Sequence, residues 1–356
     1  MFKYCLSFSL ILILLLGLGL PAAADGPGAL DWLRSKQAAD GGFAGDSDEA
    51  SSLGATVEAV FAIVSLGEDP NAWSSSEGNT PVAFLQTKAA EVTLPGDIAK
   101  TLLAAVAAKA NPRDFGGVDL IAALEAQYDP ASGLYGGPEL GNVFGQSLAI
   151  LALTATGQEA PQAAVDWLLS AQLDDGSWSW NGETTPGSGD SNSAAIALQA
   201  LQAGDYSSDA VANALAYFAA QQNEDGGFTY QKPSDFGTAT DANSTAYAIQ
   251  ALLAAGENLS DWAKDGLTPL DALLALQKES GAFQWQTAIE DENYLATVQA
   301  IPALANRSFA QVAGSIEAGP TAQLPESGGV PVLPLWIILS GLGFAGAGWA
   351  IKRKMR

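Results

Sequence analysis

The sequence contains no histidine, and its single cysteine, Cys5, lies near the start of the chain. Imidazole and thiolate groups are the usual protein ligands of zinc, copper and haem iron, so conventional sites for these metals are excluded. Ser-His-Asp and Cys-His catalysis and any acid–base step that uses imidazole are excluded as well. We therefore expect no metal and no cofactor, and any chemistry would depend on carboxylates, tyrosine, lysine or arginine.

Basic residues are also scarce, since 15 Lys and Arg stand against 39 Asp and Glu and give a formal net charge of -24. A protein needs Lys and Arg to contact phosphate groups, so nucleic acids and other polyanions are excluded as partners. We expect a solvated acidic surface that keeps the protein soluble.

The long apolar runs lie at the two ends of the chain. Residues 1–24 place Lys3 before the run LSFSLILILLLGLGL and then PAAA, which is the order of a secretory signal peptide. Residues 330–351 contain no charge and are long enough to cross a bilayer as one helix, and the basic tail 352–356 predicts its cytoplasmic side. The sequence therefore predicts an exported protein that stays at the cell surface.

Residues 308–329 are expected to form a flexible stalk in front of this span. The stalk ends in LPESGG, so an LPxSG motif, an apolar span and a basic tail follow in the order of a sortase sorting signal. Ser327 stands where that signal usually has Thr. Both a retained transmembrane anchor and covalent attachment to the wall are compatible with this arrangement.

A short pattern recurs between these ends, within residues 25–307. An aromatic residue is followed by Gln five positions later, by Gly after four more, and by a second aromatic residue after two more. The four close copies are Trp32-Gln37-Gly41-Phe43, Trp167-Gln172-Gly176-Trp178, Tyr217-Gln222-Gly226-Phe228 and Ala272-Gln277-Gly281-Phe283, the last with Ala in the first place. A looser copy has Gln127, Gly133 and Tyr135, and a degenerate one lies at residues 84–86. Steps of about 45–55 residues indicate an internal structural repeat.

Each repeat predicts a pair of helices. The first carries the Gln and ends at the Gly, which accepts the left-handed conformation of a helix C-cap. The second is rich in Ala and Leu, and small residues on most of its sides indicate that other helices surround it. The Ala-rich segments are 53–67, 97–110, 143–157, 193–204, 244–256 and 293–305. We therefore predict an all-α fold, an α6/α6 toroid with the Gln-bearing helices outside and the Ala-rich helices inside.

These copies resemble the QW repeat of the squalene–hopene cyclase and prenyltransferase superfamily, over residues 28–306. The resemblance implies an α/α toroid in which each repeat Gln bonds the backbone of a neighbouring helix and ties successive repeats together. The Gln residues concerned are Gln37, Gln172, Gln222 and Gln277. Protein prenyltransferases need Cys and His as zinc ligands, and complement-like thioester domains need a Cys, so neither function fits this chain.

Class II terpene cyclases use a DxDD motif to protonate an alkene. The nearest match is Asp46-Ser47-Asp48-Glu49, in a loop rich in Gly and Ser within the first repeat. A carboxylic acid needs a dry setting to hold its proton at neutral pH, whereas this loop predicts contact with water. A cyclase-like enzyme remains an alternative, as does a glycan-active enzyme with a pair of carboxylates.

Polar pairs stand where the inner helices are expected to begin: Asp190 with Asn192 and Asp241 with Asn243, with Asn142 at the matching place in an earlier repeat. Asp and Asn are preferred N-caps, so one residue of each pair should cap its helix and the other should be free. Because the inner helices of a toroid begin on one face, these groups would surround its mouth. The aromatic residues of nearby loops are Tyr135, Trp178, Trp180 and Tyr230. This combination suits a neutral polar ligand that has hydrogen-bonding groups and a flat face.

The tracts 241–256 and 293–307 are similar to repeats in the toroidal domain of the cobalamin carriers transcobalamin and intrinsic factor. This resemblance implies a corrinoid ligand. In those carriers a second, β-rich domain closes over the corrin, and here a separate lid or receptor protein would have to take that part. We therefore expect a surface ligand-binding protein, with an enzyme and a scaffold for protein interactions as alternatives.

Overall fold

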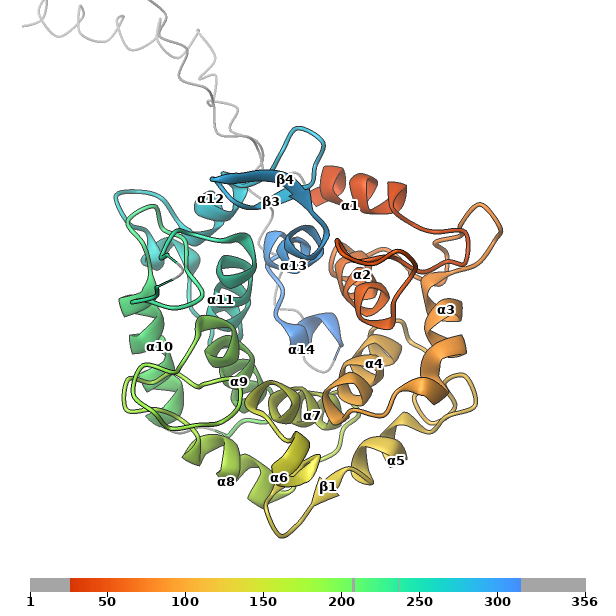
Figure 1. Ribbon diagram of the computed structural model, residues 1–356, viewed down its shortest axis with the longest axis horizontal. Coiled ribbons are helices and arrows are strands. Elements are labelled where there is room, and N and C mark those ends of the chain that lie inside the picture. The colour runs from red at the N-terminus through yellow and green to blue at the C-terminus, as the bar shows by residue number, and fades with distance from the viewer. Residues whose placement is uncertain (1–25, 207–208, 236, 315–356) are drawn as a thin grey trace, which may run out of the picture.

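The computed structural model describes residues 26–206, 209–235 and 237–314. These residues form two concentric rings of helices (Figure 1). The inner ring consists of α2 (Leu53–Ser65), α4 (Pro95–Ala107), α7 (Val143–Ala155), α9 (Ser191–Ala203), α11 (Ala242–Ala254) and α13 (Tyr294–Leu304). The outer ring consists of α1 (Gly26–Ser35), α3 (Pro81–Lys88), α5 (Leu120–Glu125), α8 (Gln162–Ser170), α10 (Asp209–Gln221) and α12 (Pro269–Leu274). The predicted α/α toroid is confirmed.

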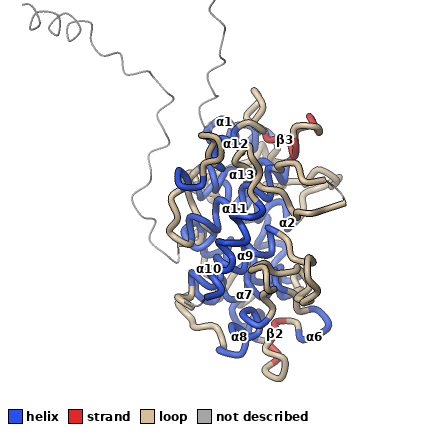
Figure 2. The backbone as a smooth tube through the Cα atoms, turned by 90° about the vertical axis from the view of Figure 1, so that its left-hand side faces the viewer, coloured by secondary structure: helices blue, strands red, loops and turns tan. Residues whose placement is uncertain are grey.

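The remaining elements are short. Two 3-10 turns, η1 (Ala89–Glu91) and η2 (Leu259–Trp262), and the helix α6 (Gly137–Leu140) lie in the connections. Two antiparallel hairpins, β1 (Tyr128–Asp129) with β2 (Leu134–Tyr135) and β3 (Phe283–Gln286) with β4 (Ile289–Asn293), precede α7 and α13. Figure 2 shows β2 and β3 on the same side of the helical rings.

The inner helices are buried on nearly every side. In α9 every residue from Ser193 to Leu201 is buried, and five of these nine are small, Ser193 and four alanines. Small side chains let each inner helix approach two inner neighbours and an outer helix at once. The outer helices instead bury one face, as α1 does with Leu30 and Leu33. The core therefore lies between the two rings and between adjacent inner helices.

The repeat Gln residues join each outer helix to the next repeat. In each case the side-chain Nε2 donates to the carbonyl of the Gly four positions later, at 2.9–3.1 Å. In three of the four, the same nitrogen also donates to a backbone carbonyl in the next outer helix or in the segment that leads to it. These second acceptors are Trp73 for Gln37 (3.1 Å), Ala210 for Gln172 (2.8 Å) and Trp262 for Gln222 (2.6 Å). The staple expected from the resemblance is present.

The repeat Gly is required for two reasons. Gly176 has φ +89°, where side chains are strained, and a Cβ there would lie 2.1 Å from the carbonyl oxygen of Asn213 in α10. Gly281 has the same φ, and its Cβ would lie 2.2 Å from the carbonyl oxygen of Gly28 in α1. The last repeat thus packs on the first outer helix as each earlier repeat packs on its successor, and the ring is closed.

The third repeat uses a different residue for its staple. Gln146, on the inner helix α7, donates from Nε2 to the carbonyls of Gly133 and Ala164, both at 2.9 Å. Its Oε1 accepts from the backbone N–H of Tyr135 at 3.0 Å. The two extra residues before Gly133 change the turn, and a Gln from the other helix of the repeat bridges it.

The prediction of a flexible stalk from residue 308 is wrong for residues 308–314. These residues include α14 (Phe309–Val312), which lies inside the ring (Figure 1). Phe309 packs against Phe61 and Tyr247, with ring centroids 5.4 and 5.9 Å apart, and its N–H donates to Gln199 Oε1 at 2.9 Å. Phe309, Ala310 and Val312 are buried because the interior of the ring offers them an apolar surface.

The other terminal predictions lie outside the described residues. They are the signal peptide at 1–24, the rest of the stalk with its LPESGG motif, the span at 330–351 and the basic tail. Within residues 26–314, apart from 207, 208 and 236, no helix is both long and apolar enough to cross a membrane.

Candidate ligand-binding site at the mouth of the toroid

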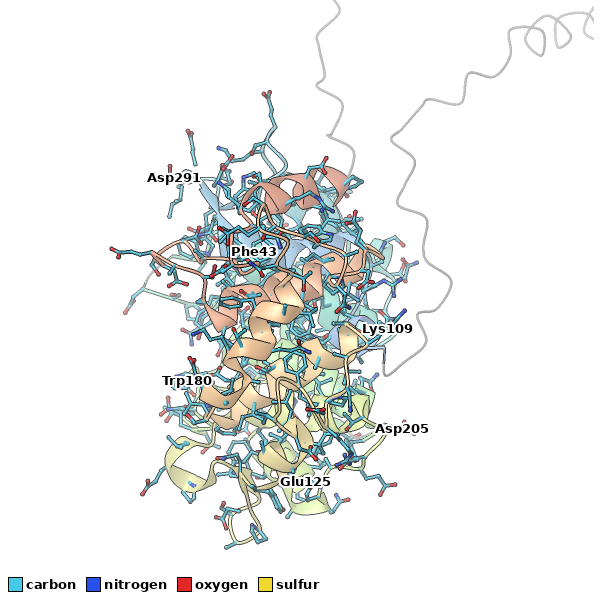
Figure 3. The ribbon with its side chains drawn as sticks, turned by 90° about the vertical axis from the view of Figure 1, so that its right-hand side faces the viewer. Phe43, Lys109, Glu125, Trp180, Asp205 and Asp291 are labelled. Atoms are coloured by element: carbon cyan, nitrogen blue, oxygen red, sulfur yellow. The ribbon has the colours of Figure 1, made fainter. Side chains whose placement is uncertain are left out.

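The inner helices begin on one face of the toroid, which we call the mouth. Figure 3 shows Trp180 and Asp291 on this face and Lys109 and Asp205 on the opposite one. The carbonyl of Trp180 accepts from the N–H of Val143, at the start of α7, at 2.9 Å. Lys109 and Asp205 follow the carboxyl ends of α4 and α9. The prediction that the polar pairs lie on one face is therefore correct.

The first member of each polar pair caps its helix. Asp190 Oδ1 accepts from the N–H of Ser193 at 2.8 Å, and Asp241 Oδ1 accepts from the N–H of Ser244 at 2.7 Å. Asn142 caps α7 in the same way, through the N–H of Gly145 at 2.7 Å. Each cap stabilises its helix by about 1 kcal/mol. Asp190 and Asp241 are only 2% exposed, so capping rather than solvation holds their carboxyl groups.

Burial also changes the titration of these two carboxyls. Burial raises the pKa of Asp190, while the N–H and hydroxyl of Ser193 act in the opposite direction. Burial likewise raises the pKa of Asp241, opposed first by the N–H of Ser244. Within the described part of the chain neither carboxyl forms an ion pair. The mouth therefore holds two buried acids with no cation beside them.

A cavity of about 310 Å³ opens at the mouth between α7, α9, α11 and α13. Aromatic side chains supply much of its wall, and Tyr230 and Trp285 are 45% and 39% exposed. Burial and the Asp190 carboxyl raise the pKa of Tyr230 to about 12, so its hydroxyl keeps its proton at neutral pH. The lining residues are Phe144, Asn192, Tyr230, Asp241, Asn243, Ser244, Tyr247, Trp285, Leu295 and Gln299.

The second member of each polar pair faces this cavity. Asn192 Oδ1 is buried and has no hydrogen-bond partner among the described residues, and the same holds for Ser244 Oγ. Asn243 Nδ2 donates to Gln299 Oε1 at 2.7 Å. The cavity thus contains amide and hydroxyl groups that a bound molecule can satisfy.

Behind the cavity, buried polar side chains continue into the ring. Gln299 Nε2 donates to Glu58 Oε1 at 3.3 Å, and Lys100 Nζ is paired with the same carboxylate. Glu58 lies on α2 and is 5% exposed, and its two partners come from α4 and α13. Asn243, on α11, joins the chain of contacts through Gln299. This chain of contacts was not predicted. The available signal was a single acid in the apolar tract LGATVEAVFAIVS and a single Lys in DIAKTLLAAVA.

The cavity brings together four of the nine predicted site residues: Asn192, Tyr230, Asp241 and Asn243. Asp190 and Asn142 serve as caps outside its lining, and Trp180 is 59% exposed on the mouth beside it. Phe144, Ser244, Tyr247, Leu295 and Gln299 also line it and were not predicted.

Tyr135 and Trp178 were predicted wrongly as ligand contacts. Both are buried, and Trp178 Nε1 donates to the carbonyl of Leu168 at 2.7 Å. They occupy the position two residues after the repeat Gly, where the side chain turns into the core.

Trp285 lines the cavity and was missed, although a signal for it existed. It follows Phe283 by two residues, as Trp180 follows Trp178 and Tyr230 follows Phe228. In each of these repeats the first aromatic residue is fully buried and the second is exposed at the mouth.

The DxDD-like motif has a structural role. Asp46 is exposed, and its carboxylate accepts from the backbone N–H groups of Tyr294 at 2.6 Å and Leu295 at 3.3 Å. Asp48 Oδ2 accepts from the N–H of Gly45 at 3.1 Å. The motif therefore shapes its loop and holds the start of α13, whose N-cap is Asn293, and it offers no acid in a dry setting.

The acidic turns before the repeat Gly are held by hydrogen bonds of their own. Asp175 Oδ1 accepts from the N–H of Ser177 and Asp225 Oδ1 from the N–H of Gly227, both at 3.0 Å. In the described ranges no group of three or more acidic side chains is placed to hold a metal ion.

Two family models match the sequence. The squalene-hopene cyclase C-terminal domain matches residues 141–295, and the prenyltransferase alpha-alpha toroid domain matches residues 4–94. A search of curated proteins gave no match.

Several solved structures share the fold. The type II terpene cyclase MstE from Scytonema is 14% identical, with a TM-score of 0.54 over 82% of this chain and 98% of the cyclase. An unsaturated glucuronyl hydrolase specific for heparin is 15% identical, with a TM-score of 0.57 over 78% of this chain and 94% of the hydrolase. Haptocorrin in complex with Cbi is 15% identical, with a TM-score of 0.50 over 81% of this chain and 67% of haptocorrin. At such identities the likeness shows the fold alone.

Proposed function

We propose that this chain, a member of the squalene cyclase/prenyltransferase α/α-toroid superfamily, is a binding protein whose mouth cavity takes a small, neutral, polar molecule with a flat face. The observation that carries this proposal is Asn192 Oδ1, buried without a partner beside the half-exposed rings of Tyr230 and Trp285. A buried acceptor without a partner costs about 1–3 kcal/mol. A ligand that donates to this oxygen recovers that free energy while its flat face covers the rings.

The charges around the cavity favour a neutral ligand. The carboxyls of Asp190 and Asp241 repel an anion, and no Lys or Arg belongs to the described lining. A cation meets the positive ends of the dipoles of α9, α11 and α13, each equivalent to about half an elementary charge and worth about 0.3–1 kcal/mol. The two effects oppose each other, so neither sign of charge gains clearly from binding.

A corrinoid is one candidate, supported by the resemblance of residues 241–256 to cobalamin carriers and by the likeness in fold to haptocorrin with Cbi. The cavity is at the lower end of the range for small-molecule pockets, about 300–1,000 Å³. A corrin ring would therefore lie across the mouth, against Trp180, Tyr230 and Trp285, with only a side group inside. Exposed Leu140 and Leu295 on the same face offer an apolar edge to a separate lid or receptor protein.

The enzyme alternatives have less support. Asp190 and Asp241 are committed to helix caps, and Asp46 binds the backbone N–H of Tyr294 at the start of α13. A scaffold for protein interactions would not need a cavity with unsatisfied polar groups. We also propose, from the apolar runs at residues 1–24 and 330–351, that the toroid is exported and held at the cell surface.

Titration of residues 25–314 with cobalamin and with cobinamide tests the proposal, with tryptophan quenching and corrin absorbance as readouts. We expect saturable binding that weakens about tenfold or more in Trp285→Ala, because loss of a stacked ring removes more than 1 kcal/mol. Binding that is unchanged in Trp285→Ala and in Asn192→Ala would place the ligand elsewhere and contradict the proposal.

A further inference from the structure

The direction of the hydrogen bonds in the mouth cavity is set by two residues that do not line it. The Lys100 ammonium can only donate, and the Glu58 carboxylate that it contacts can only accept. Glu58 Oε1 therefore accepts from Gln299 Nε2, which turns Gln299 Oε1 toward Asn243. Gln299 Oε1 in turn accepts from Asn243 Nδ2, so the side-chain oxygen of Asn243, Oδ1, is left to accept from a ligand.

Two other polar groups of the cavity are also placed as acceptors. Asn192 Oδ1 is an acceptor without a partner among the described residues, and the Asp241 carboxyl is an acceptor when ionised. Ser244 Oγ can donate or accept, so it does not oppose this preference. A molecule that fills the cavity must therefore bring hydrogen-bond donors to these oxygens. It also meets the hydroxyls of Tyr230 and Tyr247 and the indole N–H of Trp285, which can donate to its own oxygens.

The aromatic residues specify the shape of that molecule. Tyr230 and Trp285 hold corresponding positions in neighbouring repeats, two residues after the buried aromatic, and both are half-exposed. Such rings cover a flat, C–H-rich face, while the acceptors contact the edges of the same molecule. The volume of about 310 Å³ suits one six-membered sugar ring with its hydroxyl groups.

We propose that the ligand is a neutral saccharide, one unit of which enters the mouth cavity with its hydroxyls donating to Asn192, Asn243 and Asp241. Uronic acids are disfavoured by Asp190 and Asp241, which repel a carboxylate. Lys100 and Glu58 act as positioning residues, since they fix the orientation of Gln299 and Asn243 without touching the sugar. This inference rests on the proposed function and names its ligand class.

Calorimetry with the toroid, residues 26–314, tests the inference, since this stretch contains the contacts that close the ring. The probes are glucose, galactose, mannose and N-acetylglucosamine, with glucuronate, choline and cobinamide for comparison. We expect at least one neutral sugar to bind with a Kd of about 1 mM or lower and glucuronate to bind at least tenfold more weakly. Trp285→Ala should reduce the affinity about tenfold, whereas Leu94→Ala, at an exposed apolar residue that does not line the cavity, should leave it within about twofold.

Two further measurements separate polarity from shape. Deoxyfluoro analogues of the bound sugar keep its size but lose one donor each, and at least two of them should bind about tenfold more weakly. The double variant Lys100→Met, Glu58→Gln removes both charges together and frees Gln299 to rotate. It should shrink the preference for the sugar over its fluoro analogues, which a purely structural role for the pair would leave unchanged.

The outcomes are distinct. Cobinamide binding that depends on Trp285, with no sugar bound up to about 20 mM, overturns the saccharide inference and leaves the proposed function in place. Choline binding tighter than any sugar overturns it in favour of a cationic ligand. If no sugar binds, and choline and cobinamide do not bind either, both the inference and the proposed function are overturned.

Discussion

The carboxylate of Asp46 accepts a hydrogen bond from the backbone N–H of Tyr294, with an oxygen–nitrogen distance of 2.6 Å across 248 residues of chain. Tyr294 returns the contact, since its hydroxyl donates to the carbonyl of Ala55 at 2.8 Å. Trp32 Nε1 donates to Glu292 Oε2 at 2.8 Å beside them. The first and last repeats are thus joined by side chains, and the mouth keeps its shape because the ring is closed.

Asp46→Ala should lower the free energy of unfolding by about 1–2 kcal/mol, because the substitution leaves the first two N–H groups of α13, of Tyr294 and Leu295, without their acceptor at the closure. Urea denaturation measures this change. Asp48→Ala is the matched control, since Asp48 bonds only the N–H of Gly45 in its own loop, and it should cost less. Equal losses in the two variants would show that the closure contact adds nothing.

Gln222→Ala should lower the free energy of unfolding by about 2–3 kcal/mol, because it leaves the buried carbonyl of Gly226 and the partly buried carbonyl of Trp262 without their donor. Gln222→Glu keeps the size but not the donor and should be no better. The control Gln162→Ala removes an exposed Gln of the outer ring and should change stability by no more than about 0.5 kcal/mol. A small effect of both Gln222 variants would contradict the staple.

Gly176→Ala should be destabilising by about 3 kcal/mol or more, because its Cβ meets the backbone of Asn213 in addition to the strain at positive φ. Gly187 has φ +81° with open space around it, so Gly187→Ala isolates the strain alone and should cost about 1–2 kcal/mol. Thermal and urea unfolding of the two variants measure the difference. Similar losses would mean that the close approach between repeats is relaxed at little cost.

The buried caps Asp190 and Asp241 should make the protein less stable as the pH rises through their folded pKa values. A carboxyl whose pKa is raised in the folded state contributes stability below its unfolded pKa, near 3.8, and loses it as the pH rises through the folded pKa. Asp190→Asn keeps an N-cap without the charge, so its stability relative to the natural protein should improve from about pH 4 to pH 7.

Asp129→Asn gives the opposite case, because the hydrogen bond from Ser132 lowers the pKa of the partly exposed Asp129. Its stability relative to the natural protein should fall as the pH rises from the folded pKa through the unfolded value near 3.8, and it should change little above about pH 5. Urea unfolding at several pH values checks both directions, and parallel curves for Asp190→Asn and Asp129→Asn would contradict the assignment.

A chain that ends at residue 307 should be less stable than one that ends at residue 314, by about 3 kcal/mol or more. The shorter chain loses the burial of Phe309 and Val312 inside the ring. Phe309→Ala in the longer chain should account for most of this loss. Equal stability of the two chains would show that α14 is not part of the folded ring.

The sequence predicts the toroid well because its evidence is repeated. Each Gln, Gly and aromatic residue has a fixed spacing and a local physical role. Because the pattern occurs in four copies, a departure in one copy does not obscure it. The third repeat shows the limit, since Gln146 replaces Gln127 from a different helix, and no local pattern announces such a change.

The site was predicted in part, and the reason is geometric. Caps are local, so Asp190 and Asp241 could be placed at the inner helix starts. Contacts between side chains on different inner helices are not local. Glu58, Lys100 and Gln299 meet only because three Ala-rich helices have particular rotations about their axes. Helices that are buried on all sides carry no polar stripe that would reveal those rotations. The alternation at the mouth, with Phe283 buried and Trp285 exposed two residues later, is local and recurs at the same spacing in other repeats, so the sequence does contain a signal for Trp285.

The most direct test of the mouth cavity as a ligand site is a set of ¹H–¹⁵N spectra of the tryptophan indoles, recorded while a bound sugar or cobinamide is titrated in. Substitution of single tryptophans by Phe assigns the signals. The account predicts that the Trp285 signal shifts with saturation, while the signal of Trp178, which lies in the core and donates to Leu168, stays in place. A ligand that saturates the protein without moving the Trp285 signal would contradict the account.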